Sequence, residues 1–157
     1  TNSQSTQLAA TALGNNARAL AQSSSAIGDF TLATGVFSTA VGVDADALAL
    51  GAVAVGVNAL ASGEQAIVTG SNSVASGVFS TASGYISQAS ARGYSAFGAN
   101  AVATGDQASA FGNGAHATAQ GSVAIGRAAF ATGVGSIATG DAALASGAQA
   151  IAIVKAH

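Results

Sequence analysis

The sequence predicts an all-β fold, a solenoid of short parallel strands that winds once per 14-residue repeat. Glycine recurs at every fourteenth position from Gly28 to Gly140, and small and larger residues alternate with period two between the glycines. Self-similarity at a fixed period indicates a repeat architecture. A helix would not tolerate glycine every seven residues, and alternation over four to five residues is typical of a short strand.

Ten consecutive 14-residue blocks run from Asn15 to Val154. Position 5 of the block is alanine in all ten, and position 14 is glycine in nine, with Val154 closing the last. Of the 21 glycines, 16 fall in one class modulo seven, where random placement would put about three. A unit this short cannot fold alone, so we expect each strand to pair with its equivalent one coil away. Ten coils at roughly 4.8 Å each predict a rod about 48 Å long.

Position 7 is glycine in six blocks and alanine in four. In three of those four blocks a glycine stands two residues later, at Gly51, Gly93 and Gly121. We therefore expect a turn that needs one residue of positive φ, with that residue moving from position 7 to position 9.

The charged residues predict which stripes face outward. Within the blocks, charges occur only at positions 1, 2, 4 and 8, as with Arg18 at position 4, so the alanines at positions 3 and 5 are expected inside. We predict that the large residues of positions 11 and 13, such as Val123 and Ile125, pack against those alanines. Positions 10 and 12, mostly Ala and Ser, would then face outward and pack against other copies of the chain. Two alternatives remain: these small residues only keep an exposed sheet flat, or the two stripes exchange places.

The blocks also predict the domain organisation. Residues 1–14 carry only the second half of a block and are expected to form a degenerate N-terminal capping coil. Residues 15–154 would form the ten coils, and residues 155–157 are taken as a C-terminal remnant. The segment 35–42 recurs almost unchanged at 77–84, which indicates duplication of a three-coil unit.

Composition excludes several classes of function. Ten residues are charged and the net charge is −2, which argues against nucleic-acid binding. Polar residues or glycine interrupt every apolar run, so no direct membrane contact is expected. Cysteine is absent, which excludes disulfides and thiolate chemistry, and the chain begins without Met, so we expect a piece of a longer protein.

The sequence offers no catalytic, cofactor-binding or metal-binding constellation. The histidines are His116, on the solvent-facing position 4, and His157 at the terminus. A hydrolase needs a base beside a nucleophile, and the scattered Ser and Thr residues have none. Asp44 and Asp46 are close in sequence but lack further acidic ligands for calcium. We predict that the protein is not an enzyme.

Ser122-Val-Ala-Ile-Gly126, with Ala131 and Gly133, resembles the 14-residue head repeat of the YadA-like trimeric autotransporter adhesins. Looser copies begin at Ser25, Ser95 and Ser109. The Asn-Ser that often precedes Val in that motif is mostly replaced here, and the basic neck segment is not recognisable in 151–157. The resemblance implies a left-handed parallel β-roll, a homotrimer, and a place on the bacterial surface, anchored to the outer membrane in the full-length protein.

The resemblance also implies a non-enzymatic adhesin that binds host extracellular-matrix proteins (collagen, laminin or fibronectin) or host cell surfaces, or mediates autoaggregation. The alternatives are a spacer without a ligand of its own and an ice-binding solenoid, although no block has Thr at both positions 4 and 6. Exposed aromatic residues are candidate contacts, yet each could equally be structural, so no ligand-binding residue is assigned. They are Phe30, Phe37, Phe79, Tyr85 and Phe130.

Overall fold

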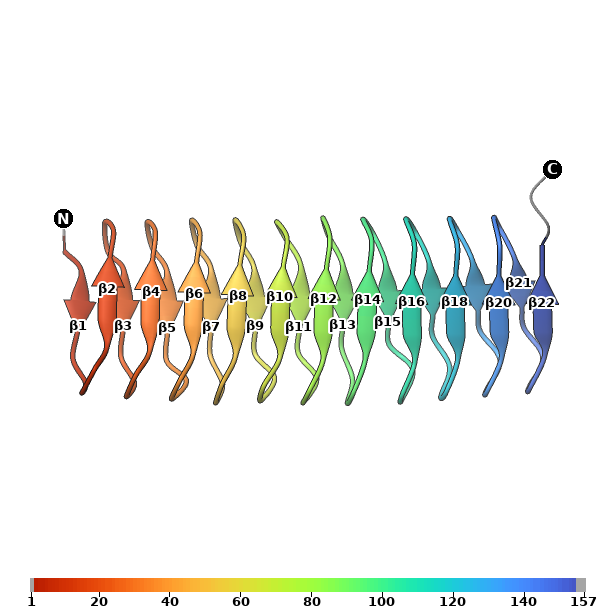
Figure 1. Ribbon diagram of the computed structural model, residues 1–157, viewed down its shortest axis with the longest axis horizontal. Helices are drawn as coiled ribbons and strands as arrows, with labels where there is room; N and C mark the ends of the chain where they lie inside the picture. Colours follow the sequence, from red (N-terminus) through yellow and green to blue (C-terminus); the bar gives the residue numbers. More distant parts are fainter. Residues whose placement is uncertain (1, 155–157) are drawn as a thin grey trace.

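The computed structural model describes residues 2–154, and over this range the chain is a β-solenoid without helices (Figure 1). Two parallel sheets of 11 strands each run the length of the rod. We call them the odd sheet and the even sheet, after the numbers of their strands. The all-β class, the parallel pairing and the predicted length of the lap are confirmed.

The odd sheet contains two-residue strands at positions 4 and 5. They are β1 (Gln4–Ser5), β3 (Arg18–Ala19), β5 (Leu32–Ala33), β7 (Asp46–Ala47), β9 (Leu60–Ala61), β11 (Val74–Ala75), β13 (Gln88–Ala89), β15 (Val102–Ala103), β17 (His116–Ala117), β19 (Phe130–Ala131) and β21 (Leu144–Ala145). The even sheet contains three-residue strands at positions 11 to 13. They are β2 (Thr11–Leu13), β4 (Ser25–Ile27), β6 (Thr39–Val41), β8 (Val53–Val55), β10 (Ile67–Thr69), β12 (Thr81–Ser83), β14 (Ser95–Phe97), β16 (Ser109–Phe111), β18 (Val123–Ile125), β20 (Ile137–Thr139) and β22 (Ile151–Ile153).

Every strand pairs in parallel with the equivalent strand of the next coil, as Val53 of β8 does with Ile67 of β10. The segment before the ten blocks contributes β1 and β2, so the described chain has 11 coils, one before the ten blocks. At roughly 4.8 Å per coil the rod is about 50 Å long. The strands β1 and β22 lie at opposite ends of the rod (Figure 1).

The interior corrects one prediction. Positions 3 and 5 of the odd sheet are inside as expected, but positions 10 and 12 of the even sheet face them. Ala54 and Ala124 at position 12 are fully buried, whereas Val55 and Ile125 at position 13 are 38% and 43% exposed. The predicted stripes of the even sheet are therefore exchanged: the small residues form the core and the large residues lie outside.

The physical reason is the narrowness of the coil. Alternation places positions 11 and 13 together on one face of the even sheet. So short a lap with two tight turns holds the two sheets too close for Val or Ile from every coil to fit between them. Alanine from both sides fills that space. Within residues 2–154 the hydrophobic core is one continuous cluster of buried alanines with two larger members, Val68 and Tyr94, and buried Ser or Thr side chains join it at positions 3 and 10.

Two tight turns close each coil, and both place a residue in the left-handed region. At position 2 Asn58 has φ 53°, and at position 9 Gln65 has φ 55°. After position 9 the amide of the next residue donates to a carbonyl three residues back, as Ala66 does to Gly63 at 3.1 Å. After position 2 the same bond closes the turn in half of the ten blocks, as from Ala101 to Gly98 at 3.2 Å. A bond of this kind, with positive φ at the third residue, is typical of a type II turn.

The turn at positions 7 to 10 therefore differs from the prediction that its left-handed residue moves. Position 9 has positive φ in every coil, and Gly51, Gly93 and Gly121 occupy it without any shift. Gly35 at position 7 is not left-handed. A Cβ there would run into the backbone carbonyl of Ala49 in the next coil, so position 7 favours glycine for space.

One of the position-9 turns is irregular. Tyr94 occupies position 10, where the other blocks have Ala or Ser, and it is 1% exposed. Its phenol donates to Asp106 Oδ1 at 2.9 Å. The amide of Tyr94 does not make the bond to the carbonyl of Ala91 that Ser80 makes to Gly77 at 3.2 Å. The bulky ring has thus opened the turn at 91–94 while the even-sheet ladder continues through it.

Candidate binding surfaces

The outer face of the even sheet is uncharged and largely apolar, with 13 large apolar residues and nine Ser or Thr residues. Its members are positions 11 and 13 of every coil, and none of them is charged. The large apolar residues on this face are Leu13, Ile27, Val41, Val53, Val55, Ile67, Phe97, Phe111, Val123, Ile125, Ile137, Ile151 and Ile153. Phe97 and Phe111 stack in neighbouring strands, with ring centroids 5.4 Å apart. Sequence reasoning placed these residues in the core and so missed this surface.

This face reaches the size of the functional patches of soluble proteins. Two columns of side chains along 11 coils cover roughly 50 Å by 10 Å, or about 500 Å², of which the Ser and Thr positions are a part. The largest apolar patch on a soluble monomer covers about 300–600 Å² and often marks an interaction site. The even-sheet outer face is therefore a candidate protein–protein interface.

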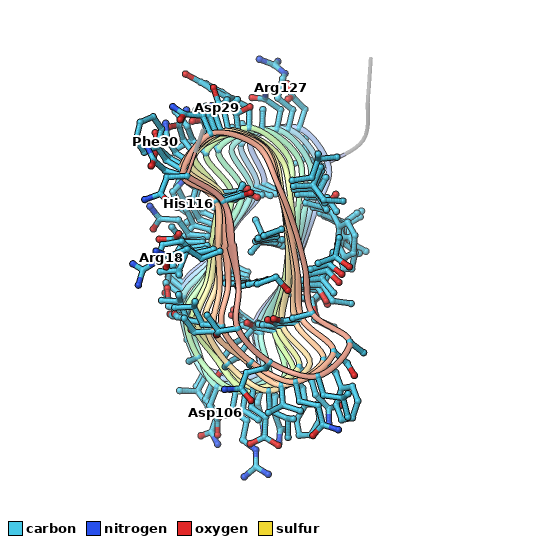
Figure 2. The ribbon with its side chains drawn as sticks, turned by 90° about the vertical axis from the view of Figure 1, so that its left-hand side faces the viewer. Arg18, Asp29, Phe30, Asp106, His116 and Arg127 are labelled. Carbon is cyan, nitrogen blue, oxygen red and sulfur yellow. The ribbon has the colours of Figure 1, made fainter. Side chains whose placement is uncertain are left out.

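The outer face of the odd sheet is mixed in character. Position 4 carries Arg18, Asp46 and His116 among apolar side chains, and Figure 2 shows Arg18 and His116 projecting outward from the same side of the rod. The ring of His116 stacks on Phe130 of the next coil, with centroids 4.8 Å apart. Phe130 is thus part of a packed pair on this face, 38% exposed.

Asp46 on this face is a perturbed carboxyl. Partial burial in β7 raises its pKa, and the nearby charge of Asp44 raises it further. The two acids do not form a cation site, because no group of three or more His, Cys, Asp or Glu side chains with metal-binding geometry occurs within residues 2–154. The carboxylates of Asp44 and Asp46 repel each other, and contact with solvent at position 4 reduces the cost of that repulsion.

The turns hold the other predicted aromatic residues. Phe30, Phe37, Phe79 and Tyr85 are each more than half exposed. Phe30 at position 2 and Phe37 and Phe79 at position 9 have φ between 58° and 61°. A bulky residue in the left-handed region is strained by about 1–3 kcal/mol, and such strain concentrates at binding sites. Phe30 lies at the edge opposite Asp106 (Figure 2), so the structure does not bring these aromatics together as one cluster.

A hollow of about 520 Å³ lies at the border between the position-9 turns and the even sheet. Gly51 has no side chain to fill the space between Phe37 and Gln65, and Leu50, Val53 and Ile67 complete the lining. The lining is apolar apart from the amide of Gln65. This hollow opens beside the even-sheet outer face, because Val53 and Ile67 belong to position 11 of that face.

The described residues contain no catalytic arrangement. His116 contacts the Phe130 ring rather than a nucleophile. Arg127 and Asp141 form an exposed ion pair, with Nη2 of the arginine 2.7 Å from Oδ2 of the aspartate and side chains 72% and 51% exposed.

No helix within residues 2–154 is long and apolar enough to cross a membrane. The Tyr94–Asp106 contact, which sequence reasoning missed, is internal: burial raises the pKa of Tyr94, and its bond to Asp106 raises it further.

Comparison with known proteins adds family evidence to this geometry. The model of the YadA head domain repeat matches successive overlapping segments, which are 5–31, 19–45, 33–59, 47–73, 61–87, 95–115, 103–129, 117–143 and 131–153. The unmatched stretch, 88–94, contains the opened turn at Tyr94. Among solved structures, the collagen-binding domain of the Yersinia adhesin YadA is similar, with 28% identity and a TM-score of 0.54 over 80% of this chain and 70% of that one. No curated protein sequence matches.

Proposed function

This chain belongs to the family of YadA head domain repeats, and from that we propose that it is the adhesive head of a bacterial surface fibre. Three copies would pack side by side as left-handed β-rolls and bind a protein of the host extracellular matrix. Collagen is the first candidate, because the similar solved structure is the collagen-binding domain of an adhesin. The full-length protein would be anchored to the outer membrane, with this segment extracellular.

The observation that carries the proposal is the uncharged apolar outer face of the even sheet. An isolated rod would expose it along its whole length, with Phe111 39% and Ile137 37% exposed. Burial at about 25 cal/mol per Å² of apolar surface favours covering the apolar part of this face on each chain. Three rods with this face toward a common axis would cover it.

The surface left for a ligand would then be the odd sheet and the position-2 residues of the turn beside it. This side carries polar, charged and aromatic groups, among them Arg18, His116 and Phe30 (Figure 2). Its coils repeat along the rod, so a fibrous ligand could make many weak contacts of the same kind. Autoaggregation and attachment to host cells would use the same exposed side.

Solid-phase binding tests the function. The head is applied to immobilised collagen, laminin and fibronectin, and we expect saturable binding to collagen. Leu60→Asp with Val74→Asp changes two neighbouring half-buried residues of β9 and β11 on the odd sheet, and should weaken binding at unchanged solution mass. Arg127→Ala, at the turn edge, is the matched control and should bind as the parent does. Absence of saturable binding to all three proteins would instead support a spacer.

We further propose that residues 1–14 cap the stack and that residues 15–154 are the adhesive repeats. The first coil pairs only with the second, through β1–β3 and β2–β4. Its side chains are largely exposed, with Leu8 at 76%. The predicted C-terminal remnant, 155–157, lies outside the described residues.

A further inference from the structure

The proposed trimer restricts how two copies can meet. A threefold axis parallel to the rod rotates each copy without moving it along the rod, so equivalent coils of the three chains lie at the same height. Such a ring uses two different patches, one edge of each chain meeting the opposite edge of the next. The edges available beside the even sheet are the turn at position 1 and the turn at positions 8 and 9. Arg127 and Asp106, which mark these turns, lie at opposite edges of the cross-section (Figure 2).

The two edges match in apolar character at three levels of the rod. At the levels of β6, β8 and β12 a large apolar residue stands at both position 8 and position 1. These pairs are Val36 with Val43, Leu50 with Val57, and Val78 with Tyr85. All other described coils have a polar residue, a charged residue or alanine at position 1. Large apolar residues at position 1 therefore occur only where position 8 of the same coil is also apolar.

The charges at the two edges do not stand opposite one another. The charged residues at one edge stand level with an uncharged residue at the other: Asp29 with Gln22, Glu64 with Ser71, Arg92 with Ala99, Asp106 with Asn113, Arg127 with Gln120, and Asp141 with Val134. No coil places two like charges at the same height. Within one chain this agreement has no local cause, because the two edges are separated by the full width of the coil.

The hollow lies at the most apolar of these levels. Leu50 and Gly51 form its floor in the coil of β8, and the position-1 residue at that height is Val57, which is 45% exposed. Val43, one coil away, is 43% exposed. A valine from a neighbouring chain would fill the space left by Gly51 between Phe37 and Gln65.

We propose that the position-1 edge of one copy docks against the position-8/9 edge of the next, with Val43 and Val57 seated in the hollow beside Gly51. The occupant of the hollow is thus a second copy of this chain, continuous with the even-sheet interface. The strained exposed rings of Phe37 and Phe79 would flank this seam. The inference rests on the proposed trimer and adds the identity and height of the contacts within it.

Engineered cysteines test the seam directly, because the chain has no cysteine of its own. The test variant carries Leu50→Cys with Val57→Cys, which we expect to meet across each of three junctions. The control carries Leu50→Cys with Arg127→Cys, which places the second thiol on the same edge but five coils away. Both variants are oxidised, and separately treated with a short flexible bismaleimide that relaxes the strict geometry of a disulfide. Circular dichroism confirms that each is folded.

The expected result is a covalent trimer on a denaturing gel from the test variant and none from the control. Two results would overturn the seam while leaving the trimer intact, provided that light scattering still gives a trimeric mass. One is that the test variant forms no covalent trimer, and the other is that the control cross-links equally well. A monomeric mass for the unmodified chain would overturn both. As a second readout, Val57→Asp should weaken assembly at least tenfold, and adding Leu50→Lys should recover most of that loss.

Discussion

Two glycines in one turn, Gly112 and Gly114, give a paired test of how closely the coils approach. Gly112, at position 14, has φ 136°, and a Cβ there would lie 2.7 Å from the carbonyl carbon of Gly126 in the next coil. Gly114, at position 2, has φ 64°, and a Cβ there would meet nothing within 4 Å. The alanine Ala128 already occupies the position equivalent to Gly114, with φ 52°.

The expected magnitudes differ accordingly. Gly112→Ala adds backbone strain of about 1–3 kcal/mol, and its Cβ also overlaps the backbone of Gly126, which pushes the two neighbouring coils apart. We therefore expect the free energy of unfolding to fall by at least about 3 kcal/mol. In a chain of this size that lowers Tm by roughly 6–12 °C. Gly114→Ala costs about 1–2 kcal/mol for the left-handed conformation, partly offset because the unfolded chain loses freedom.

Thermal unfolding followed by far-ultraviolet circular dichroism measures both variants against the parent at one chain concentration. The expected order of Tm is parent, then Gly114→Ala within about 4 °C, then Gly112→Ala well below. Two variants that melt within a degree or two of each other would refute the argument that the neighbouring carbonyl, rather than φ alone, requires glycine at position 14.

Four further outcomes follow from the same structure. Ala124→Leu, in the filled interior, should cost about 1–3 kcal/mol or more by overpacking, whereas Ile125→Leu on the outer face should cost under about 1.5 kcal/mol; chemical denaturation compares them. Ile125→Asp should leave the strand signal in circular dichroism intact but shift the solution mass from three chains towards one. Burial and the charge of Asp44 raise the pKa of Asp46 in the folded chain, so the ionised carboxylate destabilises the fold. This destabilisation disappears as the pH falls through that pKa. Asp46→Asn should therefore raise Tm near neutral pH, and the gain in Tm should vanish in acid. Arg127→Ala removes an exposed ion pair and should change the free energy of unfolding by no more than about 1 kcal/mol. Added salt should then have little further effect on the stability of the variant.

The lap and the ladder could be predicted from the sequence because glycine and alanine report on the backbone. At position 14 the backbone lies so close to a carbonyl of the next coil that only glycine fits there. Glycine therefore recurs every 14 residues, and this spacing gives the length of the lap directly. The inward face of the even sheet could not be predicted from alternation, which defines two faces without ranking them. The size range at each position held the missing signal: position 12 is alanine in nine of ten blocks, while position 13 varies from Ser83 to Phe111. A confined interior permits little variation in volume, and an outer face permits more.

The candidate binding surfaces were less predictable. The left-handed residue of the second turn is position 9, which holds Phe37 and Gln65 as well as glycine, so residue type alone misidentified it. The exposed aromatics were found, but their distribution over two turns and one sheet depends on the coil's cross-section. The hollow beside Gly51 exists because one side chain is missing between two larger neighbours, which only the stacked coils reveal.

The solution mass of the intact chain tests most directly whether the apolar outer face of the even sheet is covered by other copies. Light scattering at micromolar concentration should give three times the chain mass of 14.7 kDa. A single-chain mass, with the strand signal of circular dichroism intact, would show that the rod is stable with this face open to water, and would contradict the account.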